Sequence, residues 1–369
     1  MYEDTAPVDV WGPKWRFKAL RPVWRTAEEG RPNGDASSTI LVEPLGGLLL
    51  RETVIRADLD GLRAYDIHDG GIEGGGGAAD ARWTWSTPGR NVVAKVSWDV
   101  DAGLAYVLHH DDSRSDGDRP RVTAVDLAEG TRVSAHAYYG DLPPDAAFRA
   151  LRDSAPTTAL SGRHVVSVTD AHVESVDVRD RRRIWRTSLR VEADAEYAWI
   201  ISVDPLIVVT RERGTRGRRR LLVFDEQGKV TASPALPSRY ERVEQPATVV
   251  NGVLVATVDP DYSPSVQEED GQTEKPDWIG GIDLSTGTIL WRRSFDGLRG
   301  GCLVPYRGRL LVLHKFGTRV TVLDARNGRV AARRRLHGYG PGTLCAADDR
   351  FAVITHRTYS TPIRVFQWH

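Results

Sequence analysis

The sequence predicts an all-β protein that folds as a seven-bladed β-propeller. The first observation is a cassette of strand, tight turn and strand at residues 281–291. In this cassette Asp283 caps the turn, Gly287 accepts a positive φ, and Trp291 adds a large apolar side chain to the second strand. The other observations are that the cassette recurs and that both ends of the chain carry part of a further repeat. Repeats of about 40 to 60 residues with β patterning are typical of propeller blades.

The repeat is marked by aspartates that end the third strand of the first six blades. These are Asp66, Asp126, Asp177, Asp225, Asp283 and Asp324, in steps of 60, 51, 48, 58 and 41 residues, and a last step of 42 residues leads to Phe366. The other cassette positions are the turn glycines Gly130, Gly228, Gly287 and Gly328 and the fourth-strand tryptophans Trp24, Trp185 and Trp291. The first copy leads, after a glycine-rich insertion, to Trp83 and Trp85. We interpret the aspartates as turn caps and the tryptophans as packing between blades.

The two ends of the chain predict how the ring closes. Residues 22–26 resemble the fourth strand at 184–187, yet no blade precedes them. Residues 363–367 resemble the third strand at 221–225, and no fourth strand follows them. We therefore expect the N-terminal strand to complete the C-terminal blade, which removes the exposed edges of an open array. This closure gives seven blades, with six or eight as the alternatives.

The predicted propeller domain covers residues 21–369 and follows an N-terminal arm at residues 1–20. The arm contains Trp11, Trp15 and Phe17, and it either crosses the propeller or serves as an aromatic hook for a partner. The blades are expected at about 38–87, 91–139, 156–190, 195–236, 244–295, 299–336 and 340–369 plus 21–27. In the first blade the expected strands are Thr39–Glu43, Gly47–Val54, Gly61–Ile67 and Arg82–Ser86.

The cassette resembles the repeat of the PQQ-binding-like β-propellers, which include quinoprotein alcohol dehydrogenases and outer-membrane assembly-factor lipoproteins. That family's pattern is Ala-x-Asp-x-x-Thr-Gly-x-x-x-Trp, and residues 281–291 match it except for Gly281 in the alanine place. The resemblance implies a fold more than an activity. Quinoprotein enzymes usually have eight blades and a vicinal cysteine pair, whereas Cys302 and Cys345 are 43 residues apart. We therefore expect no PQQ and no other cofactor.

Composition narrows the class of protein. The chain carries 50 basic and 50 acidic residues, which argues against a protein built wholesale to coat nucleic acid or an anionic membrane. Arginine outnumbers lysine by 44 to 6, as in a bacterium with a GC-rich genome. No secretory signal and no apolar run of about 20 residues is visible, so we expect a cytoplasmic protein without a membrane partner. The two cysteines are expected as free, buried thiols.

Long connections decorate one face of the predicted ring. If the strands of a blade are labelled A to D from the centre outward, the B–C and D–A connections share a face. Loops at 109–120, 210–220 and 259–278 are B–C connections, and 143–154 lies in a D–A connection with a predicted short helix at 143–151. Long loops in a compact repeat fold are usually functional or disordered. The residues expected to contact a partner are His109, His110, Phe148, Arg211, Arg213, Arg216, Arg218, Tyr262, Glu268, Glu269 and Trp278.

Other chemistry has weaker support in the sequence. Residues 109–112 could ligate a transition metal and the acidic residues of 259–270 could ligate calcium, but neither segment has the spacing of a known site. The arginines of 211–220 could contact phosphates, although few aromatic residues interleave with them to stack on bases. No nucleophile elbow, phosphate-binding loop or metalloprotease motif is present in the sequence. We therefore expect no catalytic and no metal-binding residues.

These observations favour a non-catalytic propeller that acts as a scaffold or sensor subunit of a larger cytoplasmic assembly. Recognition of one or more proteins would occur through the face of the B–C and D–A connections. The alternative is an enzyme or small-ligand binder that uses the axial channel. A third hypothesis is contact with nucleic acid through residues 211–220, although we regard a nucleic-acid partner as the weaker case.

Overall fold

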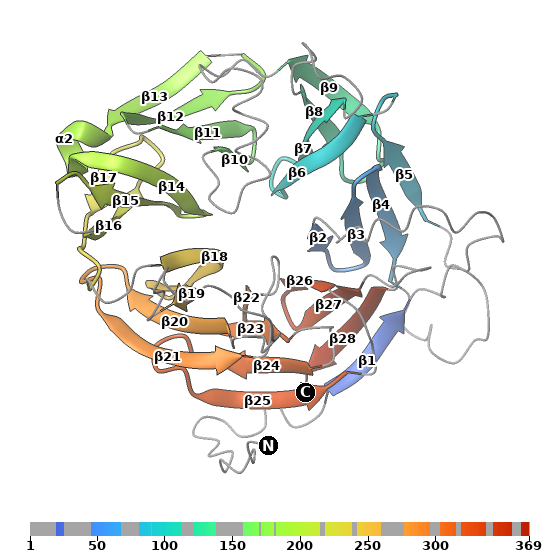
Figure 1. Cartoon of the computed structure of the whole chain (residues 1–369). Helices are drawn as coiled ribbons and strands as arrows, with labels where there is room; N and C mark the ends of the chain where they lie inside the picture. The colour runs from blue at the N-terminus through green and yellow to red at the C-terminus, as the bar shows by residue number, and fades with distance from the viewer. Residues whose placement is uncertain are drawn as a thin grey trace, which may run out of the picture.

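The structure is a computed structural model, and seven four-stranded antiparallel sheets surround a common axis in it (Figure 1). The described residues are 20–25, 46–67, 81–89, 91–111, 121–137, 158–169, 171–180, 182–214, 218–237, 242–259, 277–295, 303–314, 319–336, 342–355 and 363–368. They are almost all strand, with one short helix, so the predicted seven-bladed β-propeller is confirmed.

The first three blades follow the chain order. Blade one contains β2 (Gly46–Leu49), β3 (Thr53–Asp58), β4 (Gly61–Asp66) and β5 (Trp83–Ser86). Blade two contains β6 (Asn91–Asp99), β7 (Leu104–Asp111), β8 (Arg121–Asp126) and β9 (Arg132–Ala137). Blade three contains β10 (Thr158–Ser161), β11 (His164–Val168), β12 (His172–Asp177) and β13 (Arg182–Ser188). In each blade the first strand is innermost and the fourth lies on the rim (Figure 1).

The next three blades repeat this arrangement, with the helix α2 (Leu189–Ala193) before blade four. Blade four contains β14 (Ala195–Val203), β15 (Leu206–Glu212), β16 (Arg219–Phe224) and β17 (Val230–Ala232). Blade five contains β18 (Arg242–Val250), β19 (Val253–Asp259), β20 (Asp277–Asp283) and β21 (Ile289–Phe295). Blade six contains β22 (Leu303–Tyr306), β23 (Arg309–Leu313), β24 (Arg319–Leu323) and β25 (Val330–Arg335).

Blade seven combines both ends of the chain, as the sequence predicts. Its strands are β26 (Gly342–Ala347), β27 (Arg350–Thr355), β28 (Ile363–Trp368) and β1 (Leu20–Arg25). β1 pairs antiparallel with β28, with Leu20 opposite Trp368 and Arg25 opposite Arg364. The N-terminal strand therefore fills the outer position of the last sheet, and the ring contains no missing strand among the described blades.

The predicted second strand of blade one is wrong. The segment predicted as a single strand at Gly47–Val54 is instead split between β2 and β3, which pair with one another. Arg51 and Glu52 are exposed between them, and the Leu50 N–H donates to the Thr53 carbonyl at 2.8 Å, which closes a tight turn. Two solvated charged residues therefore end the inner strand early, and the predicted strand Thr39–Glu43 lies outside the described residues.

The hydrophobic core lies between neighbouring blades. Ile55, Trp85 and Val107 pack between blades one and two, and Leu49 and Ile354 pack where blade seven meets blade one. Corresponding clusters fill every other junction of the ring. Because burial of one such side chain stabilises the fold by about 1.5–3 kcal/mol, the apolar junctions are the main source of stability.

The repeat aspartates cap the turns between the third and fourth strands. In blades two to six, the aspartate Oδ1 accepts a hydrogen bond from the N–H two residues later at 2.8–3.0 Å. Asp66 differs, because its carboxylate pairs with Arg82 at 3.3 Å and the turn after it lies outside the described residues. The aspartates thus perform the local role that the cassette predicts, and Asp283 accepts from Ser285, which lowers the pKa of its carboxyl.

Fourth-strand tryptophans lie against the turn glycines of the following blade. Trp185 of blade three meets Gly228 of blade four, and Trp291 of blade five meets Gly328 of blade six. Trp83 makes the same contact with Gly130, so blades one, three and five all dock in this way. The Trp291 Nε1–H donates to the Ala325 carbonyl at 2.7 Å, which fixes the ring on the turn. Gly287 instead faces Pro234 and Ala235, and the side chain of Trp24 lies outside the described residues.

Candidate interaction face

The order of the strands places the B–C and D–A connections on one face of the ring, which we call the loop face. The A–B and C–D turns lie on the opposite face, which we call the turn face. Most of the predicted long connections lie outside the described residues, at 112–120, 138–157, 215–217 and 260–276. The predicted helix at 143–151 belongs to these segments. The described part of the loop face is therefore made by the strand ends and by α2.

His109 is buried and is not available to a partner. Its side chain is 1% exposed, and its Nε2 lies 2.8 Å from the Thr123 hydroxyl on the neighbouring strand. The ring also meets the edge of Trp85 from blade one, with the ring centroids 6.0 Å apart. The sequence places His109 at the start of a polar loop, but its strand continues to Asp111 and turns this side chain into the junction between blades. The predicted partner contact at His109 is therefore wrong.

Three of the predicted arginines stand exposed at the end of blade four. Arg211 lies 3.9 Å from the Glu196 carboxylate, while the Arg213 N–H donates to the Asp194 carbonyl at 2.9 Å. Arg218 begins the return strand, and its carbonyl accepts from the Glu212 N–H. The structure thus brings these arginines together on the loop face beside α2. The positions outside the description are Phe148, Arg216, Tyr262, Glu268 and Glu269, together with the side chain of His110.

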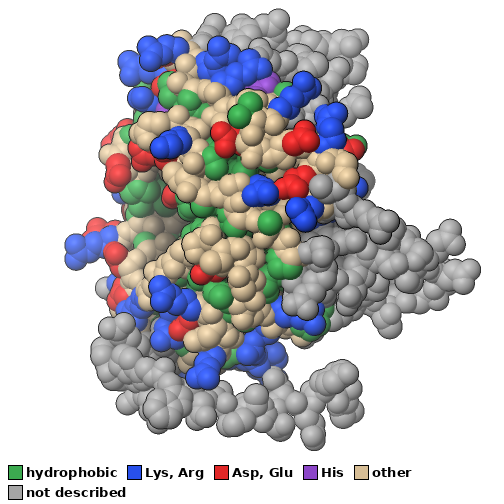
Figure 2. Space-filling model, turned by 90° about the vertical axis from the view of Figure 1, so that its left-hand side faces the viewer, with side chains coloured by type: hydrophobic (Ala, Val, Ile, Leu, Met, Phe, Trp, Pro, Cys, Tyr) green, Lys and Arg blue, Asp and Glu red, His purple; other side chains and the backbone are tan. Residues whose placement is uncertain are grey.

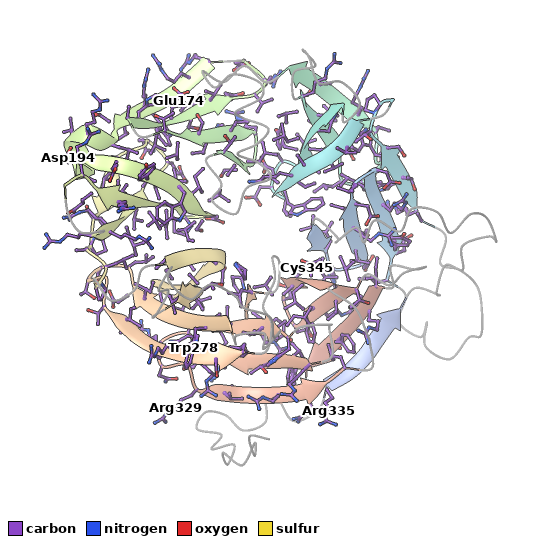
Figure 3. All side chains as sticks on the ribbon, in the orientation of Figure 1. Glu174, Asp194, Trp278, Arg329, Arg335 and Cys345 are labelled. Atoms are coloured by element: carbon purple, nitrogen blue, oxygen red, sulfur yellow. The ribbon has the colours of Figure 1, made fainter. Side chains whose placement is uncertain are left out.

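Trp278 is the remaining predicted contact, and the structure places it at the start of β20 in blade five. It is partly buried against the core between blades four and five. The Arg292 guanidinium lies 5.0 Å from the Trp278 ring centroid, a cation–π arrangement. Figure 3 shows Trp278 on this side of the ring, so it lies on the blade next to the arginines of blade four.

The structure also exposes two apolar residues that the sequence does not single out. The Val191 side chain is 82% exposed on α2, and Tyr197 is 57% exposed near the start of β14. Tyr197 lies opposite Arg211 in the strand pairing, so the two are cross-strand neighbours. Exposed apolar side chains beside arginines are characteristic of protein-binding surfaces. Their one signal in the sequence is that residues 189–194 form a D–A connection, which lies on the loop face.

The local sequence explains why α2 presents Val191 outward. Leu189 and Ala193 are one helical turn apart and are both buried between blades three and four. The Leu189 N–H donates to the Ala171 carbonyl at 2.9 Å, which ties the helix start to blade three. Asp194 ends the helix in the left-handed conformation with φ 44°, and it lies at the outer edge of the ring in Figure 3. Val191, between the two anchors, therefore faces solvent.

The charges on this side of the ring are mixed. Figure 2 looks onto the side that contains α2 and shows basic and acidic side chains interspersed, with basic side chains gathered at its upper edge. The exposed arginines of β13 are Arg182, Arg183 and Arg186. Such a surface favours a partner with matching patches over a uniformly charged polymer.

Several titratable side chains lie buried or partly buried inside the blades. Glu174 is 3% exposed, accepts from the Ser167 hydroxyl at 3.4 Å and lies 3.8 Å from His172 Nε2. Burial lowers the pKa of Lys95 to about 8, and its Nζ donates to the Thr158 carbonyl at 2.9 Å. Burial also lowers the pKa of His164. Ser167 is itself buried, so Glu174 and Ser167 form a structural hydrogen bond within one sheet.

Among the described residues, no group of three or more histidine, cysteine or acidic side chains is arranged to hold a metal ion. No helix in the described part of the chain is long and apolar enough to cross a membrane.

The fold and the repeat define the class: a seven-bladed β-propeller built from PQQ-like repeats. A family model described as outer membrane protein assembly factor BamB matches residues 169–336, which confirms the predicted resemblance over blades three to six. No curated protein matches the chain.

Several solved structures are similar to this chain at low sequence identity. BamB from Moraxella catarrhalis is 14% identical, with 95% of this chain and 100% of that chain covered and a TM-score of 0.48. The computationally designed Ika8 protein is 11% identical, with coverages of 92% and 98% and a TM-score of 0.49. The WD40 propeller domain of Doa1 is 12% identical, with coverages of 94% and 98% and a TM-score of 0.48.

The cysteines do not fit the quinoprotein pattern. Cys345 is buried where blade seven meets blade one, close to Gly47, and burial raises the pKa of its thiol to about 12. Cys302 lies outside the described residues and 43 positions earlier, so the two cannot form the adjacent pair that the enzymes of this superfamily carry. The resemblance of the repeat to that of the PQQ-binding enzymes is therefore no reason to assign PQQ to this chain.

Proposed function

We propose that this chain is a protein-recognition propeller, which binds one or more protein partners as a subunit or sensor of a larger cytoplasmic assembly. The interaction would use the loop face. The single observation that carries the proposal is the pair of exposed apolar side chains, Val191 and Tyr197, beside the exposed Arg211 and Arg213. Tyrosine and arginine are the residue types that most often dominate the binding energy of protein interfaces.

The rigidity of the site supports this proposal. Val191 is held by the buried anchors Leu189 and Ala193, while Tyr197 and Arg211 lie on paired strands. A surface whose side chains are fixed by the scaffold loses little conformational entropy when a partner binds. Propellers as a fold host many functions, so the assignment depends on this surface and not on the ring.

Single substitutions on the two faces test the proposal. The chain is purified with its partner from the native host, and the retained partner is quantified for Val191→Asp and Tyr197→Asp. Each buries a charge in the proposed interface, so we expect at least a tenfold loss of affinity. Val100→Asp is the matched control, because Val100 is 52% exposed on the turn face. Equal partner retention in all variants, or an equal loss in Val100→Asp, would refute the use of the loop face.

A further inference from the structure

Blade three has a strongly basic outer strand. β13 is the last strand of its sheet, and none of the described strands pairs with its outer edge. Residues 182–191, which run from β13 into α2, contain four arginines and no acidic residue, a formal charge of 4 − 0 = +4. Figure 2 shows basic side chains gathered along the upper edge of this side of the ring, where β13 lies in Figure 1. The four arginines are all exposed, and they are Arg182, Arg183, Arg186 and Arg190.

The carboxylates opposite β13 are engaged elsewhere. Arg182 lies opposite Asp177 in the strand pairing, but the Asp177 carboxylate is buried and lies 3.0 Å from Arg163 Nε. Arg186 lies opposite Glu174, whose buried carboxylate accepts a hydrogen bond from within its own sheet. Neither Arg182 nor Arg186 forms an ion pair with a carboxylate of the described ranges. The positive charge of β13 is therefore open to an external anion.

A β-bulge arranges the side chains of this strand. The pairing shifts register between Ser175 and Val176 of β12, which makes Ile184 the extra residue of β13. The bulge brings Arg183 and Arg186 to the same face of the sheet, because their partners on β12 are two positions apart. The Ile184 side chain is 40% exposed between them. Since a bulge interrupts an edge for pairing with an added strand, a partner would contact these side chains and not the backbone.

Arg186 is oriented by a neutral group. Its Nη2 donates to His172 Nδ1 at 2.9 Å, and the Thr169 hydroxyl lies 3.2 Å from the same nitrogen. Because Nδ1 accepts a hydrogen bond from a guanidinium, the His172 imidazole is neutral. The contact therefore fixes the guanidinium without cancelling its charge, which reduces the entropy that Arg186 loses when it binds an anion.

We propose that the arginine rim, made of Arg182, Arg183, Ile184, Arg186 and Arg190, binds a short acidic and apolar segment of the protein partner. Guanidinium groups bind carboxylates through two parallel hydrogen bonds, and Ile184 offers an apolar contact among them. β13 runs directly into α2, so the arginine rim is continuous with the exposed Val191 of the loop face. The inference rests on the proposed function, because it assigns the chemistry of one part of the partner.

A short peptide fits the arginine rim better than a nucleic acid. β13 has seven residues, which is a length of about 20 Å. Exposed carboxylates bound the basic run at both ends, with Asp180 before it and Glu192 after it. A long phosphate backbone would be repelled where it passes these carboxylates, and it would gain nothing from Ile184. A peptide that combines acidic and apolar side chains matches both the length and the composition of the rim.

Peptide binding to the full chain tests the arginine rim. The probe is a labelled eight-residue peptide of alternating glutamate and leucine, compared with its glutamine–leucine counterpart and with a single-stranded DNA of eight nucleotides. Fluorescence anisotropy measures each affinity at a fixed salt concentration. We expect the glutamate peptide to bind at least tenfold more tightly than the other two.

Variants locate the binding on the rim. Arg183→Gln/Arg186→Gln should weaken binding of the glutamate peptide at least tenfold, and Ile184→Ser should weaken it about threefold. The matched control is Arg326→Gln/Arg329→Gln, which removes two exposed arginines from the turn face of blade six. Figure 3 shows Arg329 far around the ring from Glu174 of blade three. This control should change the affinity less than twofold.

Several results would overturn the inference. Equal binding of the glutamate and glutamine peptides would show that carboxylates are not recognised, and tighter binding of DNA would indicate a phosphate site. An equal loss in the blade-six control would show that only general charge matters, and an unchanged affinity in Ile184→Ser would remove the apolar contact. If the peptide fails to bind while Val191→Asp still releases the partner, the arginine rim is wrong and the proposed function stands. If the peptide binds as expected while Val191→Asp retains the partner, the loop-face proposal fails and the arginine rim stands.

Discussion

Turn glycines let the tryptophan rings of one blade lie directly on the turn of the next. At Gly228, φ is 77° and an added Cβ would lie less than 3.0 Å from the Trp185 ring. At Gly103, φ is 68°, but an added Cβ would meet nothing within 4 Å. The two glycines share the backbone requirement and differ only in the close approach of the ring.

This difference gives a matched pair of substitutions. Gly103→Ala should lower the free energy of unfolding by roughly 1 kcal/mol, because only the left-handed backbone conformation is strained. Gly228→Ala should lower it by about 3 kcal/mol, because the ring must also move. Urea denaturation followed by tryptophan fluorescence measures both. Equal losses would mean that the contact with Trp185 contributes nothing.

Lys95 gives the stability of the protein a dependence on pH. Burial lowers the pKa of its ammonium group to about 8 in the folded chain, from 10.5 as the ordinary value. Between these values the unfolded chain holds more protons than the folded chain, so the free energy of unfolding rises with pH through this window.

The variant Lys95→Met isolates this effect. Between pH 8 and pH 10.5, the wild type should gain about 2 kcal/mol of stability relative to the variant, after allowance for solvent screening of a partly exposed group. Urea denaturation at pH 7, 8, 9 and 10 gives the difference at each pH. A difference that stays constant across the series contradicts the assignment of a lowered pKa.

At the residue scale, local chemistry could be predicted and burial could not. The turn caps at Asp126 and Asp225 depend on hydrogen bonds to residues two positions away, so residue type and spacing suffice. The burial of His109 depends on Trp85 and on Thr123, from another blade and another strand. The sequence pattern of two histidines and two aspartates at residues 109–112 does not indicate which side chains of other strands lie next to His109.

At the element scale, the closing strand β1 stabilises the ring because it completes blade seven. It is paired with β28 from Leu20 to Arg25, and the sequence predicts this pairing from two incomplete repeats. The strands of blade one were harder to predict, because glycine and leucine residues before Arg51 obscure where one strand ends. The five residues of α2 give too little periodicity to predict a helix.

Deletion of the closing strand should expose the edge of β28 and weaken both junctions of blade seven. A chain that lacks residues 1–27 should unfold at least about 10 °C below the full chain, or aggregate through the open edge. A chain that lacks residues 2–18 keeps β1 and serves as the control, with a transition close to that of the full chain. Differential scanning calorimetry compares the three. An unchanged transition after deletion of 1–27 would show that closure is dispensable.

At the scale of the whole molecule, the ring has two faces that carry different connections. The loop face carries the B–C and D–A connections, and the turn face carries the A–B and C–D turns. The order of the strands predicts which connections share a face, because each strand reverses direction within a blade. The convergence of Val191, Tyr197 and Arg211 could not be predicted, because it depends on how α2 packs between blades three and four. The scaffold can therefore be predicted from the repeat, whereas the proposed recognition surface can be identified only in the three-dimensional structure.

The most direct test of this account is site-specific photo-crosslinking in the native host. A photoreactive amino acid replaces Val191 on the loop face in one strain and Val100 on the turn face in another. We expect a crosslink to a protein partner from position 191 and none from position 100. Crosslinks only from position 100, or from neither position while the partner still co-purifies, would contradict recognition through the loop face.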